Sequence, residues 1–272
     1  MTGTGTQADP YMPANWDEIV EAIGEADAYV KCVPNLIINW NDIDPTGKMY
    51  DIDFYCDDFD GNGLIISGIF INFDNWSNCL FDNALGGIIK NISFLNFNIN
   101  SGCLFSGSSR YTTRFQNLVF DGIIAERNSR LLSSNVSYIE YSYIGLKLYG
   151  GAYVTSSNLN LYHSILNIEN DKNSYSNHYL NLTGSDYIFK GSYGNKVGVS
   201  YTYRAILDFE LTRGSSSDFT TGTNADKQNM IIYNNDKIPI ENPGIIPATT
   251  AQLRDPEALK ALGFTIRSVQ NE

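Results

Sequence analysis

Three residues that could carry out acid–base chemistry recur at an even spacing in the middle of the chain. Glu140, His163 and Asp186 are separated by 23 residues each, and each stands five residues after an asparagine that precedes an alternating apolar segment. If those segments stack, the three side chains form one column with neighbours about 5 Å apart. Carboxylates and an imidazole at that distance can exchange protons, and two carboxylates about 5 to 10 Å apart can cleave a glycosidic bond. The alternative is a polar residue at the solvent corner after each strand, so no catalytic residue is assigned.

A second group of candidates is aromatic. Five tyrosines fall within sixteen residues, at Tyr138, Tyr141, Tyr143, Tyr149 and Tyr153. Exposed aromatic rings form platforms for sugar rings, whereas buried ones fill a β-rich core. We therefore treat these five as candidate glycan-binding residues, with core packing or subunit contact as the alternative.

A third group could hold a cation. Asp58, Asp60 and Asn62, followed by Gly63, match the opening of an EF-hand calcium loop, but Ile69 stands where that loop needs a bidentate glutamate. A turn leading into a strand from residue 64 is the simpler interpretation, and no metal site is predicted. The phosphate-binding, dinucleotide-binding and zinc-protease motifs are missing from the sequence, so no cofactor is expected.

The elements that would position these residues are signalled by the four cysteines. Cys32, Cys56, Cys79 and Cys103 are 24, 23 and 24 residues apart, and the Cys-Leu-Phe at Cys79 recurs at Cys103. A period of 20 to 50 residues is typical of repeat proteins, in which each unit buries its apolar face against its neighbours. Since the first ten residues do not resemble a secretory signal, we interpret the cysteines as a ladder of buried free thiols.

A recurring asparagine phrase extends the pattern. An asparagine followed by an alternating apolar segment appears five times, at steps of 26, 18, 23 and 23 residues. The asparagine suits a turn in which its side chain hydrogen-bonds the equivalent residues above and below. These observations predict an all-β fold, a parallel β-helix of about eight coils over residues 28–240. The usual handedness of crossover connections favours a right-handed path. The phrases begin at Asn91, Asn117, Asn135, Asn158 and Asn181.

Both ends of the repeat region carry helix signals. Residues 1–27 comprise a flexible Gly- and Thr-rich lead and a capping helix that Asn15 begins and Gly24 ends. Residues 241–272 form a C-terminal cap with a short helix that Asp255 begins, and Thr249 and Gln252 read as a capping box before it. We expect these helices to cover the open strand edges of the first and last coils.

Composition narrows the range of partners. The chain has 30 acidic and 18 basic residues, a formal net charge of −12. A nucleic-acid partner is not expected, because such proteins neutralise phosphates with lysine and arginine. No stretch approaches the ~18 consecutive apolar residues of a membrane span, so no membrane partner is expected.

The chain resembles the right-handed parallel β-helix proteins of tailed bacteriophages and prophages. The resemblance rests on the coils, on residues 11–18 with their short helix, on the Asp-Gly-Asn-Gly at 60–63, and on the closing segment 259–264. It implies a non-enzymatic virion surface protein, such as a capsid decoration, head fibre or spike. The implied state is a homotrimer that binds phage capsid or tail proteins and assembles in the host cytoplasm.

Two alternatives to that role remain. One is a phage tail spike that binds or degrades a host surface glycan, as a glycoside hydrolase or polysaccharide lyase. The other is a bacterial surface adhesin or polysaccharide lyase.

Overall fold

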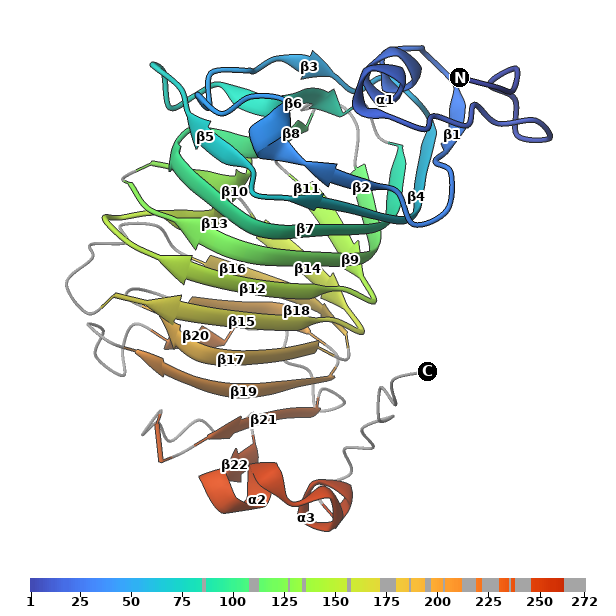
Figure 1. Cartoon of the computed structure of the whole chain (residues 1–272). Helices are drawn as coiled ribbons and strands as arrows, with labels where there is room; N and C mark the ends of the chain where they lie inside the picture. The colour runs from blue at the N-terminus through green and yellow to red at the C-terminus, as the bar shows by residue number, and fades with distance from the viewer. Residues whose placement is uncertain are drawn as a thin grey trace.

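The computed structural model shows a parallel β-solenoid of about six turns, with short helices at its ends (Figure 1). It describes residues 1–84, 87–107, 113–126, 128–133, 136–155, 158–171, 180–185, 187–193, 197–202, 204–211, 219–221, 230–234, 236–237 and 246–261. The expectation of a parallel solenoid is confirmed, and the turns are slightly fewer than the eight expected. In the last layers, the described residues form strands on two faces only.

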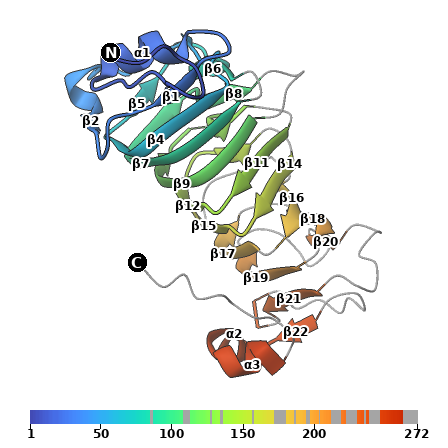
Figure 2. The same ribbon diagram turned by 90° about the vertical axis from the view of Figure 1, so that its right-hand side faces the viewer.

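Face A is the first of three strand ladders that run down the solenoid (Figure 2). Its pairs are all parallel, and the long strands β4, β7 and β9 contribute only their first halves. The strands of face A are β1 (Tyr29–Lys31), β4 (Asp58–Ser67), β7 (Ile88–Ser101), β9 (Thr113–Ile124), β11 (Val136–Glu140), β14 (Asn158–Tyr162), β16 (Leu180–Ser185), β18 (Val197–Thr202) and β20 (Phe219–Thr221).

Face B follows face A around a corner, and the two together form one 17-stranded sheet. It contains the second halves of β4, β7 and β9, and a short 3-10 helix (Trp40–Asp42) follows its first strand. The other strands of face B are β2 (Ile37–Asn39), β5 (Phe70–Asn72), β12 (Tyr143–Leu148), β15 (Ile165–Asn170), β17 (Tyr187–Tyr193), β19 (Arg204–Leu211), β21 (Met230–Asn234) and β22 (Ile246–Ala248).

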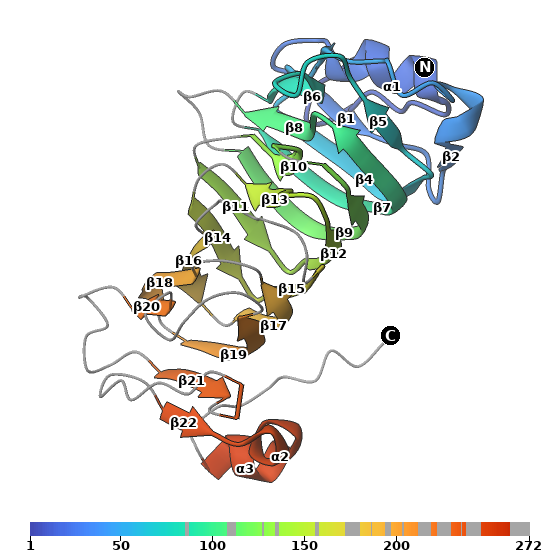
Figure 3. The ribbon, with the colours of Figure 1, turned by 90° about the vertical axis from the view of Figure 1, so that its left-hand side faces the viewer.

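Face C has strands in the N-terminal part of the solenoid alone, as far as the described residues show (Figure 3). It is a separate five-stranded parallel sheet. Its strands are β3 (Ile52–Asp53), β6 (Cys79–Ala84), β8 (Cys103–Gly107), β10 (Arg130–Leu132) and β13 (Tyr153–Thr155).

The corner between faces A and B is made by single residues with left-handed backbone. Asn62, Asn91, Asn117, Tyr141 and His163 have φ values between 50° and 59°. Asparagine tolerates this conformation better than most residues, and its amides form a ladder here. The Asn117 Nδ2 donates to Asn91 Oδ1 at 2.8 Å, and the Asn91 Nδ2 donates to Asp60 Oδ1 at 2.8 Å. The predicted role of the asparagine as a hydrogen-bonded turn residue is confirmed at these positions.

Aromatic stacks fill the solenoid interior. Phe94 stacks on its register partner Phe120 with ring centroids 5.3 Å apart, and Phe81 stacks on Phe105 at 4.8 Å. Each fully buried side chain of this kind contributes about 1.5–3 kcal/mol to folding. Because a repeat stacks like on like, the turns share one continuous core.

The first turn is covered by the N-terminal segment. Helix α1 (Trp16–Ile23) begins where Asn15 Oδ1 accepts from the Glu18 amide, as predicted, and it buries Trp16 and Ile23. The lead before it was expected to be flexible. Instead, Tyr11 pairs with β1: its amide donates to the Tyr29 carbonyl at 2.9 Å, and its carbonyl accepts from the Lys31 amide at 2.8 Å. The lead therefore covers the edge of the first strand.

The last described turn ends in two short helices. Helix α2 (Thr250–Arg254) has the predicted capping box between Thr249 and Gln252, and α3 (Pro256–Ala261) begins after Asp255. Leu259 of α3 packs with Ile206 and Ala248 in a small cluster separate from the main core. Residues 262–264 of the closing segment lie outside the described residues. None of the described helices is long and apolar enough to cross a membrane.

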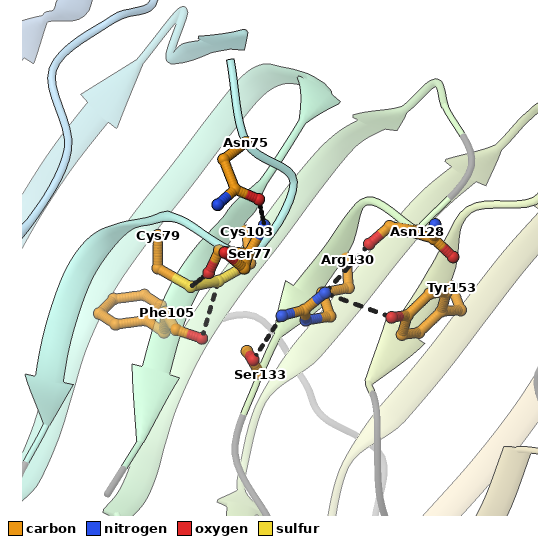
Figure 4. The surroundings of a disulfide bond; sticks show 9 residues. All are labelled: Asn75, Ser77, Cys79, Cys103, Phe105, Asn128, Arg130, Ser133 and Tyr153. Carbon is orange, nitrogen blue, oxygen red and sulfur yellow. Dashed lines mark hydrogen bonds between the residues drawn. A yellow bond between two sulfur atoms is a disulfide. The ribbon is translucent and has the colours of Figure 1, made fainter. Parts of the chain in front are cut away.

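The cysteines correct the prediction of a free-thiol ladder. Cys79 and Cys103 are register partners on face C and form a disulfide between adjacent turns (Figure 4). Cys32 and Cys56 are free and buried. Burial, followed by the charge of Asp60, raises the pKa of Cys32 to about 12, and burial also raises the pKa of Cys56. The 24-residue spacing thus identified one stacked pair, but it could not distinguish thiols from a disulfide.

Candidate functional site

The predicted column of Glu140, His163 and Asp186 does not form. In the parallel register of face A, Glu140 lies beside Gln116 in one turn and Tyr162 in the next. His163 is one residue further along, at the corner, and Asp186 lies outside the described residues. The predicted alignment of His163 with Glu140 was therefore wrong by one residue. The catalytic roles of these residues stay predictions, and the shared column on which they depended is not formed.

The error arose because the asparagine phrase combines two structural positions. Asn91 and Asn117 occupy the corner between faces A and B. Asn158, by contrast, is the first residue of a face A strand and pairs with Val136. Counting five residues from asparagines of both kinds mixes different columns, because a one-residue shift moves a side chain to the opposite face of a strand.

Glu140 lies in an aromatic setting on face A. Its Oε2 accepts a hydrogen bond from Gln116 Nε2 at 2.9 Å. Tyr138 and Tyr162 stack beside it, with ring centroids 5.8 Å apart and planes at 18°. Burial, followed by the nearby Tyr138 and Glu140, raises the pKa of Tyr162. Glu140 is thus held by a neighbouring turn and borders a pair of half-buried rings.

A second stacked pair stands at the corner itself. Tyr141 and His163 occupy the same left-handed position in adjacent turns, and their rings are 5.0 Å apart and nearly parallel, at 9°. Tyr141 is 62% exposed and His163 is also exposed. Together with Tyr138 and Tyr162, they form what we call the aromatic corner.

The five tyrosines predicted to bind glycan do not share one surface. Tyr138 and Tyr141 belong to the aromatic corner, and Tyr143 follows on face B. Tyr149 is exposed just beyond the end of β12, whereas Tyr153 is buried on face C. Tyr162 and His163 were missed as aromatic partners. Their spacings of 24 from Tyr138 and 22 from Tyr141 in the sequence are the signal that could have identified them.

An open groove lies on face B, beside the aromatic corner. Its volume is about 510 Å³, and it extends over the turns that contain β7, β9, β12 and β15. The Tyr143 ring lies over Gly145, where an added Cβ would be 2.7 Å from the ring, and its hydroxyl accepts from Asn167 Nδ2 at 3.3 Å. We call this the face B groove. Besides Tyr143, the polar residues that line it are Asn96, Asn98, Asp121, Lys147, Asn167 and Glu169.

The groove has a composition suited to a hydroxyl-rich ligand. Side-chain amides both donate hydrogen bonds to hydroxyls and accept them, and carboxylates accept them. The buried Oδ1 of Asn98 has no hydrogen-bond partner within the described residues, so an acceptor there is unused. Lys147 and Glu169 form an exposed ion pair at 3.6 Å along one side. With turns about 4.8 Å apart, the groove is long enough for a short oligosaccharide.

The residues considered for a cation are bound to other groups. Asp58 pairs with Lys90 at 2.8 Å, and Asp60 Oδ1 accepts from the Asn62 amide at 2.8 Å as well as from Asn91. They also do not precede a strand: β4 runs through residues 58–67 and bends at Asn62. Across the described ranges, no three His, Cys, Asp or Glu side chains are grouped to hold a metal.

No known protein family, curated protein or solved structure matches this chain. The fold and the surfaces described above are therefore the features that point to a function. Two of them could receive a partner: the aromatic corner, with its exposed stacked rings, and the face B groove beside it. Both lie on turns that are rigidly paired on either side, so their side chains are held in place before any partner binds.

Proposed function

We propose that the protein is a non-enzymatic bacteriophage virion surface protein, a capsid decoration, head fibre or spike that presents a rigid β-solenoid. The observation that carries this proposal is that the rod is covered at both ends. Tyr11 and α1 cover the first turn, and α2 and α3 follow the last described strand (Figure 1). Uncovered end strands would pair with other chains and form fibres, so a covered rod is suited to standing singly or in a small oligomer on a surface.

The contacts of the acid–base candidates support a structural role. Glu140 is bonded to Gln116 in the adjacent turn, and the His163 ring is stacked on Tyr141. Both side chains therefore connect neighbouring turns. Residues that connect turns in this way favour a rod over a catalytic site, in which the carboxylate and imidazole would face a common substrate.

The proposal includes a location and partners. The protein would reside in the virion after assembly in the host cytoplasm, bound to capsid or tail proteins, as a homotrimer. Its net charge of −12 is consistent with a surface that stays soluble and repels its own copies except at specific contacts.

Immunogold electron microscopy tests this proposal. Antibodies raised against the folded protein should label intact particles purified from the source culture, at the head or at the tail. A matched sample of particles labelled with pre-immune serum gives the background. Particles that carry no label, although the protein is detected in the producing cells, would contradict the proposal.

A second candidate function is a glycan-directed tail spike, and the face B groove favours it. Tyr143 supplies a ring over Gly145, and polar side chains surround it. A panel of host polysaccharides, immobilised and probed with the purified protein, tests this candidate. Binding that Tyr143→Ala abolishes would support it. Cleavage that persists in Glu140→Gln would show that Glu140 is not catalytic.

A further inference from the structure

Arg130 is a buried cation on face C. It is 5% exposed and lies in register between Cys103 of the preceding turn and Tyr153 of the next. Although the chain has 30 acidic residues, no carboxylate of the described residues forms an ion pair with it. A buried charge is costly unless it is paired and hydrogen-bonded, so this position needs an explanation.

The guanidinium is only partly satisfied (Figure 4). Its Nη1 donates to the Asn128 carbonyl at 3.1 Å and to the Tyr153 hydroxyl at 3.3 Å, and its Nη2 donates to Ser133 Oγ at 2.7 Å. An arginine has five N–H groups, and these three bonds leave two. One is on Nε, which is buried and has no partner among the residues that the structure describes, and the other is on Nη2. Nε and Nη2 lie on the same edge of the guanidinium.

Two aromatic rings pack against the same side chain. The Arg130 Cζ is 5.4 Å from the centre of the Trp76 ring and 5.9 Å from that of Tyr153. Tyr153 is buried, whereas Trp76 is 49% exposed. Trp76 lies in the exposed segment 74–77, shortly before the disulfide at Cys79. Arg130 is therefore covered on one side by a side chain that is itself open to solvent.

We propose that Arg130 and Trp76 form a binding site for a carboxylate. A carboxylate is planar and accepts two parallel N–H bonds from one edge of a guanidinium, which matches the two unfilled groups on Nε and Nη2. Because Nε is buried and Trp76 is the exposed side chain that packs on Arg130, the ligand would approach from the Trp76 side. An acidic sugar fits this site further, because the exposed Trp76 ring can stack on a sugar ring while Arg130 takes the carboxylate.

The site is distinct from the face B groove. Arg130 and Trp76 are on or beside face C, whereas the groove is on face B. The groove offers amides and carboxylates for neutral hydroxyls, and the Arg130 site offers a cation. The inference therefore stands whether or not the protein proves to be a virion component.

Isothermal titration calorimetry of the whole chain tests the proposal. The probes are glucuronate, the uncharged glucose, acetate and inorganic phosphate. We expect saturable binding of glucuronate and none of glucose. Binding of acetate as well would show that the site takes any small carboxylate, and binding of glucuronate alone would show that it takes an acidic sugar. Either result supports the proposal.

Variants locate the binding. Arg130→Gln should weaken glucuronate binding at least tenfold, and Arg130→Lys should also weaken it because an ammonium lacks the two-pronged edge. Arg254→Gln, which removes an exposed arginine in α2, is the matched control and should bind as the original protein does. If Arg130→Gln does not fold, the melting temperature of the original protein provides the test. Glucuronate should raise it and glucose should not.

Three results would overturn the proposal. The first is the absence of saturable glucuronate binding by the original protein. The second is binding of glucose or phosphate as tight as that of glucuronate, which would show that the carboxylate is not recognised. The third is unchanged affinity in a folded Arg130→Gln variant.

Discussion

Cys79 and Cys103 occupy equivalent positions in adjacent turns, with Cα atoms 4.5 Å apart, and their disulfide joins β6 to β8 (Figure 4). Parallel strands already hold these turns together, so the bond adds a covalent connection to a ladder of hydrogen bonds. The other two cysteines, Cys32 and Cys56, are buried and free. The four cysteines thus have two chemical states, which thiol measurements can separate.

Thiol counting should reveal this division. Native protein should react with Ellman's reagent negligibly at neutral pH, because burial raises the pKa of Cys32 to about 12 and so keeps it protonated. Denatured, unreduced protein should titrate two thiols per chain, and denatured protein after reduction should titrate four. Four thiols without reduction would show that Cys79 and Cys103 are not bonded.

Loss of the disulfide should lower stability. A cross-link that closes a loop of this length stabilises a protein by about 3 kcal/mol. We therefore expect the urea midpoint of the original protein to fall when a reductant is added. The double variant Cys79→Ala with Cys103→Ala serves as the control, because a reductant should leave its midpoint unchanged. Equal midpoints with and without reductant in the original protein would contradict the expectation.

Substitution of Asn91 in the corner ladder should destabilise the fold in two ways, through lost hydrogen bonds and through the cost of a left-handed backbone. Asn91 has φ of 59° and bonds both Asp60 and Asn117. Asn91→Ala loses both bonds, worth about 1 kcal/mol each, and must also adopt a left-handed backbone at a cost of about 1 kcal/mol or more. Asn91→Gly loses only the bonds. Urea unfolding should show the alanine variant as less stable, and equal stability would argue against the corner geometry.

The cysteine and helix signals of the sequence were sufficient to predict much of this fold. The step of 24 residues between Cys79 and Cys103 is the register of β6 on β8, and the capping residues Asn15 and Thr249 begin α1 and α2 as expected. These features could be predicted because each depends on local chemistry or on one repeated spacing.

The candidate site was less predictable because a column depends on register. The sequence alignment placed His163 next to Glu140, but a register different by one residue places Tyr162 there. The asparagine phrase caused this error because it occurs both at corners and at the start of strands. The Arg130 cluster depends on Trp76, 54 residues away in the sequence, which meets Arg130 only after two turns have stacked. No pattern within one repeat could show that contact.

The tyrosines should divide into two groups on substitution. Tyr153 is 4% exposed, its ring packs against Arg130, and its hydroxyl accepts a hydrogen bond from Arg130 Nη1, so Tyr153→Ala should lower the free energy of unfolding by about 3 kcal/mol. Tyr141 is 62% exposed, so Tyr141→Ala should change it by no more than about 0.5 kcal/mol. Chemical denaturation followed by circular dichroism measures both. Similar losses for the two variants would contradict the assignment of faces.

Asp44 should make the loop 44–49 sensitive to acid. Burial alone would raise the pKa of Asp44. Hydrogen bonds from Thr46 and Met49 lower it by more than burial raises it, so the pKa of Asp44 lies below its usual value. A lowered pKa stabilises the fold above the ordinary value of about 4, and that contribution is lost as the pH falls through the lowered pKa. Asp44→Asn should therefore be less stable than the original protein at pH 7, by about 1–3 kcal/mol.

Melting temperatures of both proteins across the acidic range measure that difference. The gap between them should stay constant at neutral pH and narrow as Asp44 becomes protonated. The matched control is Asp74→Asn, because Asp74 is exposed and forms an ion pair with the exposed Lys48. A gap that does not change with pH would show that the carboxylate charge of Asp44 is not what stabilises the loop.

The most direct test of the proposed function is a count of copies in purified particles. Particles from the source culture are banded on a density gradient, and peptides of this protein are quantified against those of the major capsid protein by mass spectrometry. A virion surface protein should co-purify at a fixed ratio: hundreds of copies for a capsid decoration, or a small multiple of three for a spike or fibre. Absence from banded particles, with the protein present in the cells, would contradict the account.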